Sequence, residues 1–116
     1  MRQFETKDSG KRQDYESGMR RDIQENKPRY DLIVPLEGVC MLDRWADLMY
    51  RGMVKYGERN WEKANSLVEL VRFKASAFRH FMQWFRGLED EDHAAAVYFN
   101  IQCSETVKER LAKEEE

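Results

Sequence analysis

Cysteine, proline and long apolar runs are scarce in this sequence. Its 116 residues include two prolines and two cysteines. Cys40 and Cys103 are too few and too scattered for a disulfide framework or a structural zinc site, so we expect free, buried thiols in a reducing compartment. No apolar run approaches the ~18 residues of a membrane span, and the first residues contain no hydrophobic signal region. These absences predict a soluble, unprocessed, cytoplasmic protein.

A large net charge is also absent. The 20 basic residues and 22 acidic residues give a formal net charge of −2 at pH 7. Such a balance provides no global electrostatic reason to bind nucleic acid or an anionic membrane. We therefore expect neither a nucleic acid duplex nor a membrane among the partners.

The sequence contains enough apolar residues for one core, together with a heavily charged surface. Hydrophobic residues make up 41% and charged residues 36% of the chain. A chain of this length supports one domain, and a strand-rich domain would contain more Val, Ile and Thr. We predict an all-α domain over residues 27–112, preceded by a flexible or extended arm over 1–26 and followed by a charged tail over 113–116.

Three helices are predicted within the domain. Apolar residues in steps of three and four predict a helix over residues 36–56. Ser66 and Glu69 match a capping box that begins a second helix, which should end near Arg86 and Gly87. A last helix is predicted over 90–112. The second helix is apolar around most of its circumference, so we expect it to be central or shared in a homodimer or homotetramer.

Acidic residues on the first helix carry the first functional signal. At 100° per residue, Asp43 falls inside the apolar arc and Asp47 at its edge. A carboxylate on a buried face costs several kcal/mol unless a proton, a cation or a metal compensates it. Asp43 and Asp47 are therefore candidate metal ligands.

The last predicted helix can be analysed in the same way, with 100° per residue. It places Glu89, Asp92, His93 and Asn100 on one face, and it points Glu91 elsewhere. Oxygen ligands one turn apart on two helices are how helical bundles build cation sites, and hard oxygens favour Mg²⁺ or Mn²⁺.

A purely structural interpretation of these acids stays open. Asp43 could pair with Arg44, Arg72 or Arg79, and the acids at 89–92 could complement the positive end of the last helix.

Other residue types suit a nucleotide, and each also has a structural interpretation. The basic residues of "RRDIQENKPR" could contact a polyphosphate or remain solvated. Tyr56 and Trp61 could stack on a base or anchor the core. Arg79 could clamp a phosphate or form an internal salt bridge, and the two histidines could be bases, phosphate contacts or hydrogen-bonded helix residues.

Three stretches in this order carry a family resemblance. "GMRRDIQENKPRYDLI", "KYGERNW" and "RHFMQWFRGLEDEDHAAAVYFN" resemble motifs of the phage-type dATP/dGTP diphosphohydrolase family, which is similar to the MazG-like all-α nucleoside triphosphate pyrophosphohydrolases. The likeness runs over residues 18–100. It implies a MazG-like bundle of about four helices with an extended N-terminal arm, completed by oligomerisation, in the host cytoplasm if a phage encodes the chain.

The resemblance also assigns the acids. Glu89-Asp90-Glu91-Asp92 matches the Glu-x-x-Asp of MazG-like enzymes, which implies catalytic and metal-binding roles for Glu89 and Asp92. The first acidic element departs from the family, because Asp43 and Asp47 stand where MazG-like chains have Glu-Glu-x-x-Glu. In the phage-type branch a second histidine would fall where this chain has Ala96.

The implied activity is Mg²⁺- or Mn²⁺-dependent hydrolysis of deoxynucleoside triphosphates, with a purine preference, to the monophosphate and pyrophosphate. The residues then expected to bind substrate are Arg20, Lys27, Arg29, Lys55, Tyr56, Asn60, Trp61, Arg79, His80, His93 and Asn100. Two alternatives stay open. One is a non-enzymatic helical adaptor or phage regulatory protein, and the other is an enzyme with the same metal site and a different nucleotide substrate.

Overall fold

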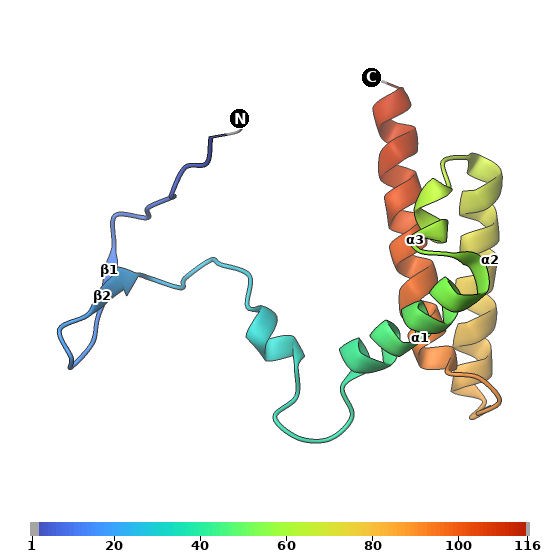
Figure 1. The fold of residues 1–116 in the computed structure, drawn as a ribbon, viewed down its shortest axis with the longest axis horizontal. Coiled ribbons are helices and arrows are strands. Elements are labelled where there is room, and N and C mark those ends of the chain that lie inside the picture. Colours follow the sequence, from blue (N-terminus) through green and yellow to red (C-terminus); the bar gives the residue numbers. More distant parts are fainter. Residues whose placement is uncertain (1–2, 116) are drawn as a thin grey trace. The chain divides into compact units, whose positions relative to one another are not determined.

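The computed structural model describes residues 3–115, which are mostly helical (Figure 1). The elements, in chain order, are β1 (Arg12–Asp14), β2 (Arg20–Asp22), the 3-10 helix η1 (Tyr30–Ile33), α1 (Met41–Tyr56), the 3-10 helix η2 (Asn60–Lys63), α2 (Leu67–Phe85) and α3 (His93–Glu114). The chain divides into two compact units, one ending at Ile33 and the other beginning at Val34. The described part thus has three α-helices, and the predicted bundle of about four is not confirmed.

The first unit contains a small antiparallel hairpin of β1 and β2. Asp14 lies opposite Arg20 and their side chains form an ion pair of 2.8 Å, while Arg12 lies opposite Asp22. Gly18 takes a φ of 89° in the turn, a conformation that costs glycine little. The chain is thus mostly helical with a small two-stranded sheet, so the all-α prediction is only partly confirmed, and the flexible or extended arm over residues 1–26 stays a prediction. Opposite charges face each other across the strands, a pairing that hydrophobic periodicity does not detect.

In the second unit the predicted capping box is confirmed at the start of α2. The Ser66 hydroxyl accepts a hydrogen bond from the backbone N–H of Glu69 at 3.2 Å. The Glu69 carboxylate accepts from the Ser66 hydroxyl at 2.7 Å and from the backbone N–H of Asn65 at 3.0 Å. At the other end, Gly87 has a φ of 79° directly after the C-cap Arg86, where the sequence predicts the stop.

The other two helices begin later than predicted. α1 begins at Met41 instead of Leu36, after Gly38 takes a φ of 92°. α3 begins at His93 because Asp92 is its N-cap, with a carboxylate oxygen that accepts from the backbone N–H of Ala95 at 3.1 Å. Residues 89–92 therefore form a loop and not a helical turn, which changes the directions of their side chains.

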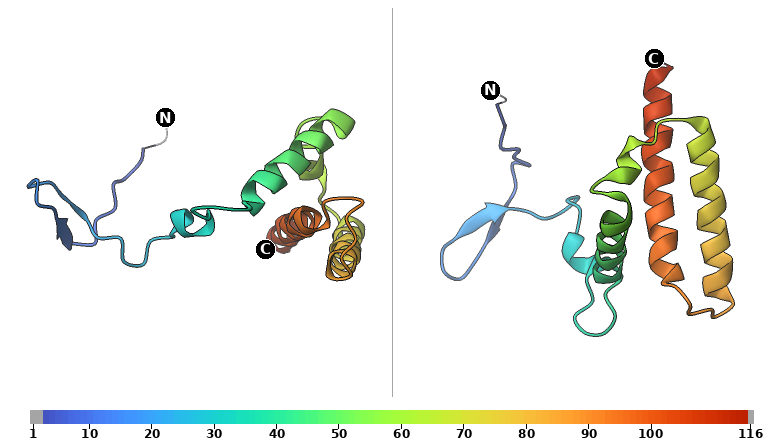
Figure 2. Two further views of the ribbon diagram at one scale, coloured as in Figure 1. Left: turned by 90° about the horizontal axis from the view of Figure 1, so that it is seen from below. Right: turned by 45° about the vertical axis from the view of Figure 1, so that its right-hand side comes forward.

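α2 and α3 pack along each other, while α1 and η2 pack against α3 (Figure 2). The seam between α2 and α3 is apolar towards one end, where Leu70 packs with Val107. The side chain of Arg110 joins η2 to α3 through a hydrogen bond of 2.7 Å to the carbonyl of Ala64. These contacts give the second unit one small core.

The outer faces of the helices are strongly apolar and exposed. On α2, Val71, Phe78 and Phe85 are 59%, 69% and 71% exposed. On α1, Tyr50 and Val54 are also exposed. No helix within residues 3–115 has both the length and the apolar character needed to cross a bilayer.

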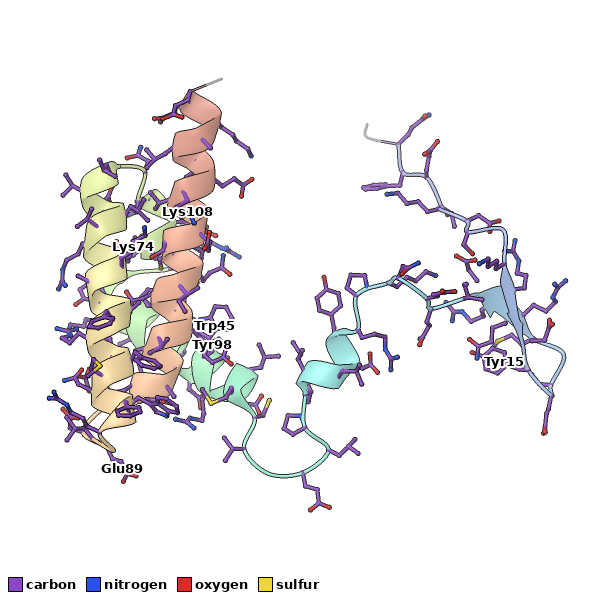
Figure 3. The ribbon with its side chains drawn as sticks, turned by 180° about the vertical axis from the view of Figure 1, so that it is seen from behind. Tyr15, Trp45, Lys74, Glu89, Tyr98 and Lys108 are labelled. Carbon is purple, nitrogen blue, oxygen red and sulfur yellow. The ribbon has the colours of Figure 1, made fainter. Side chains whose placement is uncertain are left out.

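The predicted inward direction of Asp43 is wrong within this chain. α1 turns Trp45 towards α3, where its ring lies 6.1 Å from the ring of Tyr98 (Figure 3), and Asp43 is exposed. The apolar arc that placed Asp43 inward belongs to the exposed face of α1. A helical wheel identifies an apolar face, but it does not say which protein surface covers that face.

Candidate functional site

A cleft of about 870 Å³ is the candidate functional site of the second unit. It is lined by α1, the turn after α1, the loop between α2 and α3, and the first turns of α3. The polar and aromatic residues on its walls are Asp47, Arg51, Lys55, Tyr56, Arg59, Asn60, Trp61, His80, Glu89, Asp90, Glu91, Asp92, Phe99 and Asn100.

The cleft brings together most of the site residues predicted in this unit. Those that line it are Asp47, Lys55, Tyr56, Asn60, Trp61, His80, Glu89, Asp92 and Asn100. They come from segments up to 53 positions apart in the numbering, between Asp47 and Asn100. Acids, cations and aromatic rings predicted from separate motifs therefore share one surface.

The other predicted site residues do not line this cleft. Asp43 is exposed on α1, and Arg79 and His93 lie behind His80 in a hydrogen-bonded chain described below.

The basic residues predicted from the N-terminal motif belong to the first unit, where each has an acidic neighbour. Arg20 pairs with Asp14 at 2.8 Å, Lys27 with Asp22 at 3.3 Å, and Arg29 with Asp31 at 2.7 Å. Their expected role in substrate binding stays a prediction.

The four consecutive acids have four different environments. Asp92 caps α3 and forms a two-pronged ion pair with Arg44 of α1, at 2.9 and 2.5 Å. The hydrogen bond from Arg44 lowers the pKa of Asp92. Asp90 accepts a hydrogen bond of 2.7 Å from His93, which lowers the pKa of Asp90. The side-chain carboxylates of Glu89, near the end of the loop in Figure 3, and of Glu91 form no hydrogen bond or ion pair with the described residues.

The helical wheel predicted that Glu91 points away from the site, but in the structure Glu91 lines the cleft. Its carboxylate lies with ring nitrogens of His80 and His93 in a group whose ligand atoms are all within 4.8 Å of one another. The prediction is wrong because residues 89–92 precede α3, so the helical angle of 100° per residue does not apply to them.

Four residues form a directed chain of hydrogen bonds that includes His80 and Asp90 of the cleft wall. Arg79 Nη2 lies 3.3 Å from His80 Nε2, and His80 Nδ1 lies 2.9 Å from His93 Nδ1. His93 Nε2 lies 2.7 Å from Asp90 Oδ1. Because a guanidinium can only donate and a carboxylate can only accept, the ring protons belong on His80 Nδ1 and His93 Nε2. Every link is then satisfied with one proton on each ring.

Burial separates these two histidines from the solvated acids around them. His93 is 2% exposed and His80 is 8% exposed. Burial lowers the pKa of His80, and the neighbouring charge of Arg79 lowers it further. The neutral imidazole of His80 is therefore favoured, and its nitrogen lone pair, on Nε2, accepts the hydrogen bond from Arg79.

Two of the three cations of the cleft, Arg51 and Lys55, lie on the exposed side of α1, and the third, Arg59, follows the helix. Asp47, Arg51 and Lys55 follow each other at intervals of four residues and all line the cleft. The Lys55 ammonium lies 5.0 Å from the centre of the Tyr56 ring. The Trp61 ring meets Phe99 edge-on, with ring centres 6.5 Å apart.

Sequence reasoning missed Arg51, Arg44, Asp90 and Glu91. A signal for Arg51 was present, because it lies one helical turn from both Asp47 and Lys55. Arg44, by contrast, meets Asp92 across 48 positions in the numbering, and no local pattern indicates that pair.

A comparison with known families gives an independent result. The family described as "dATP/dGTP diphosphohydrolase, N-terminal" matches residues 17–115, which is most of the chain. The searches of curated proteins and of solved structures give no match. The family match includes the cleft and all three α-helices, so this chain belongs to the dATP/dGTP diphosphohydrolase family.

Proposed function

We propose that this chain hydrolyses deoxynucleoside triphosphates, with dATP and dGTP preferred, to the monophosphate and pyrophosphate, and that it uses Mg²⁺ or Mn²⁺. The observation that carries the proposal is the shared cleft, where carboxylates without an ion-pair partner lie with three cations and with aromatic side chains. Cations bind the phosphate chain and aromatic rings stack on a base. The purine preference rests on the family alone.

Two of the four predicted metal ligands fit a hard cation well. Asp47 and Glu89 line the cleft, and neither carboxylate has an ion-pair partner among residues 3–115. Free carboxylate oxygens of this kind are the ligands that Mg²⁺ prefers. Once bound, the ion neutralises phosphate charge and makes an attacking water more acidic.

The other two predicted ligands fit less well. Both carboxylate oxygens of Asp92 already accept hydrogen bonds from Arg44, and Oδ1 also accepts from the N-terminus of α3. Asp43 does not line the cleft. We therefore assign the metal to Asp47 and Glu89, and we give Asp92 the role of fixing the loop that carries Glu89.

The walls of the cleft favour water as the nucleophile. No serine, threonine or cysteine lines the cleft in the described part of the chain. Attack of water on the α-phosphorus releases pyrophosphate and leaves the monophosphate. Arg51 and Lys55 hold the charge of the phosphate chain, and Trp61 with Tyr56 provides the surface for the base.

Asn100 is suited to recognising a polar edge of the substrate. Its side-chain N–H₂ group donates to the carbonyl of Ala96 at 2.8 Å, which fixes the orientation of the amide. The amide oxygen forms no hydrogen bond with the other described residues, and Asn100 lines the cleft. This oxygen can accept a hydrogen bond from a base or a sugar hydroxyl.

We also propose that the MazG-like bundle is completed by a second copy of the chain, in a homodimer or homotetramer. The support is the exposed apolar surface of α2, where Val71, Phe78 and Phe85 recur every seven residues on one face. A contiguous apolar face of this kind is typical of an interface and rare on a monomer.

The proposal is tested with a panel of dNTPs and NTPs in the presence of Mg²⁺, with pyrophosphate and orthophosphate measured separately. We expect pyrophosphate from purine deoxynucleotides, no turnover in EDTA, and recovery with Mn²⁺. Full turnover in EDTA, or orthophosphate as the first product, contradicts the reaction. An inert protein that still assembles through α2 supports the helical adaptor instead.

A further inference from the structure

Two histidines and one glutamate meet where α2 ends and α3 begins. One ligand atom from each of His80, Glu91 and His93 lies within 4.8 Å of the other two. We propose that this group is a second metal site, selective for a first-row transition ion such as Zn²⁺ or Co²⁺ over Mg²⁺. It is separate from the carboxylate pair of Asp47 and Glu89, and it does not rest on the proposed reaction.

The spacing of the two imidazoles suits one ion. His80 Nδ1 and His93 Nδ1 are 2.9 Å apart. Two nitrogens bound to one ion at about 2.1 Å are separated by roughly 3.0 Å in octahedral and 3.4 Å in tetrahedral geometry. The ion can therefore replace the hydrogen bond between the rings with a change of a few tenths of an ångström in the distance between the two nitrogens, once the rings turn so that both Nδ1 lone pairs point at the ion. Glu91 is exposed, so its side chain can turn to provide the third ligand.

An outer carboxylate already orients one of the ligands. Asp90 accepts a hydrogen bond of 2.7 Å from His93 Nε2, which keeps the proton on that nitrogen and directs the Nδ1 lone pair towards His80. A histidine that binds metal through one nitrogen usually donates from the other to a carboxylate or carbonyl. Asp90 and His93 have this arrangement.

The ligand types decide which ion is bound. Imidazole suits zinc, copper, iron and nickel, whereas Mg²⁺ prefers oxygen ligands. Two histidines and one carboxylate leave open positions for water or a phosphate oxygen. Because His80 and Glu91 line the cleft, these positions are accessible from it.

Metal binding requires one proton to move within the pair of rings. His80 now carries its proton on Nδ1 and accepts a hydrogen bond from Arg79 at Nε2. With the ion on Nδ1 the proton transfers through solvent to Nε2, so the two rings together release no proton. The Arg79 guanidinium then faces an N–H and must turn away, and its exposed position allows this.

The test is titration of the tag-free protein with Co²⁺ or Zn²⁺ alone, without nucleotide. The chain has only two histidines, so every imidazole signal in a nuclear magnetic resonance spectrum belongs to this group. We expect one equivalent of Zn²⁺ to shift both sets of ring signals together. Co²⁺ should give visible bands of nitrogen and oxygen ligands without thiolate charge transfer, even with millimolar Mg²⁺ present.

Variants separate this site from the carboxylate pair. We expect Glu91→Gln and His80→Gln to weaken Zn²⁺ binding at least tenfold. Asp90→Asn should weaken it by about 10-fold to 100-fold, as outer carboxylates do elsewhere. Glu89→Gln is the matched control, an acid two residues from Glu91 that lines the same cleft, and it should bind Zn²⁺ as the wild type does.

Three results overturn the inference. The first is that folded wild-type protein does not bind Zn²⁺ when Zn²⁺ is in 100-fold excess over protein. The second is that Glu91→Gln and His80→Gln both bind Zn²⁺ as tightly as the wild type. The third is that the cobalt bands disappear in Cys40→Ser. Glu91 is exposed, so its variant should fold even if a histidine variant does not. Because no substrate is present, failure of the proposed hydrolysis leaves this test unaffected.

Discussion

The two sides of α2 differ in how many large apolar side chains they carry. An isolated domain buries such side chains, but on α2 the largest ones lie on the exposed side. The side that faces α3 carries Leu70 and Phe73 towards one end and the buried His80 towards the other. The opposite side carries Phe78 and Phe85, which are 69% and 71% exposed. The largest apolar rings are thus outside the core. The seam with α3 provides close packing and the site, and the outer face is the surface that we propose for assembly.

The largest effect is expected from breaking the outer face. The double variant Phe78→Asp with Phe85→Asp places two charges in each copy of the proposed interface. A single anchor residue of an interface often contributes about 2 kcal/mol or more to binding, so its loss weakens the affinity ~30-fold. We expect multi-angle light scattering to show a dimer or tetramer for the wild type and a monomer for the double variant at micromolar concentration.

Lys108→Asp is the control for that comparison, since Lys108 is an exposed residue of α3 with a neighbouring Glu105. It should leave the mass unchanged. A wild type that is monomeric at 100 µM contradicts the assignment of the outer face to assembly.

The second largest effect is expected on stability, when a leucine on each side of α2 is changed to alanine. Leu70 is 7% exposed and packs in the core, whereas Leu67 is 64% exposed. Leu70→Ala should lower the free energy of unfolding by about 2–5 kcal/mol, as a buried leucine does. In the monomeric outer-face variant, Leu67→Ala should change it by less than about 0.5 kcal/mol. Urea melts measure both, and equal losses would remove the distinction between the sides.

The helical part of the second unit was predictable from local signals, since Ser66, Glu69 and Gly87 mark the ends of α2 as the sequence indicates. The candidate residues of the cleft were largely predictable, because the motifs that carry Lys55, Trp61 and Glu89 are local in sequence. Which helix face is covered was not predictable, because the apolar arc of α1 remains exposed in the single chain. Asp43 was misplaced for that reason.

Partners far apart in the sequence were also beyond local reasoning. Asp92 could be a metal ligand, a helix cap or an ion-pair partner by its type alone, and only the approach of α1 brings Arg44 to it. The hairpin in the first unit was missed because charged strands lack an apolar alternation.

A third prediction compares Asp92 and Glu89, two acids of the same loop to which the sequence analysis gave the same metal-binding role. Asp92→Ala removes a helix cap worth about 1 kcal/mol and a partly exposed ion pair worth about 0.2–1 kcal/mol. Asp92→Asn keeps a good cap and loses only the pair. Glu89→Ala should be close to neutral for stability, because Glu89 has no ion pair among the described residues.

The stability of the Asp92 pair should depend on pH in one direction. The folded state lowers the pKa of Asp92, so its contribution is present above the unfolded pKa of about 3.9 and is lost as the pH falls through the folded value. The wild type and Asp92→Asn should therefore differ at pH 7 and converge once the pH is below the folded pKa of Asp92. A difference that persists after the Asp92 carboxyl of the folded protein is protonated, as followed by nuclear magnetic resonance, would show that the carboxylate charge is not the cause.

The smallest effect is expected at the N-terminus of α2, where one cap supports both sides of the helix equally. Ser66→Ala removes the acceptor for the Glu69 backbone N–H and should cost about 1 kcal/mol of stability. Ser66→Asp should be nearly neutral, since aspartate caps as well as serine, although it lies beside the Glu69 carboxylate. Because the cap is far from the cleft in sequence and does not line it, Zn²⁺ affinity and nucleotide turnover should be unchanged in folded Ser66→Ala. Thermal melts give the stability, and a change in Zn²⁺ affinity of tenfold or more in this variant would show that the site depends on the setting of the whole helix and not on its last turns.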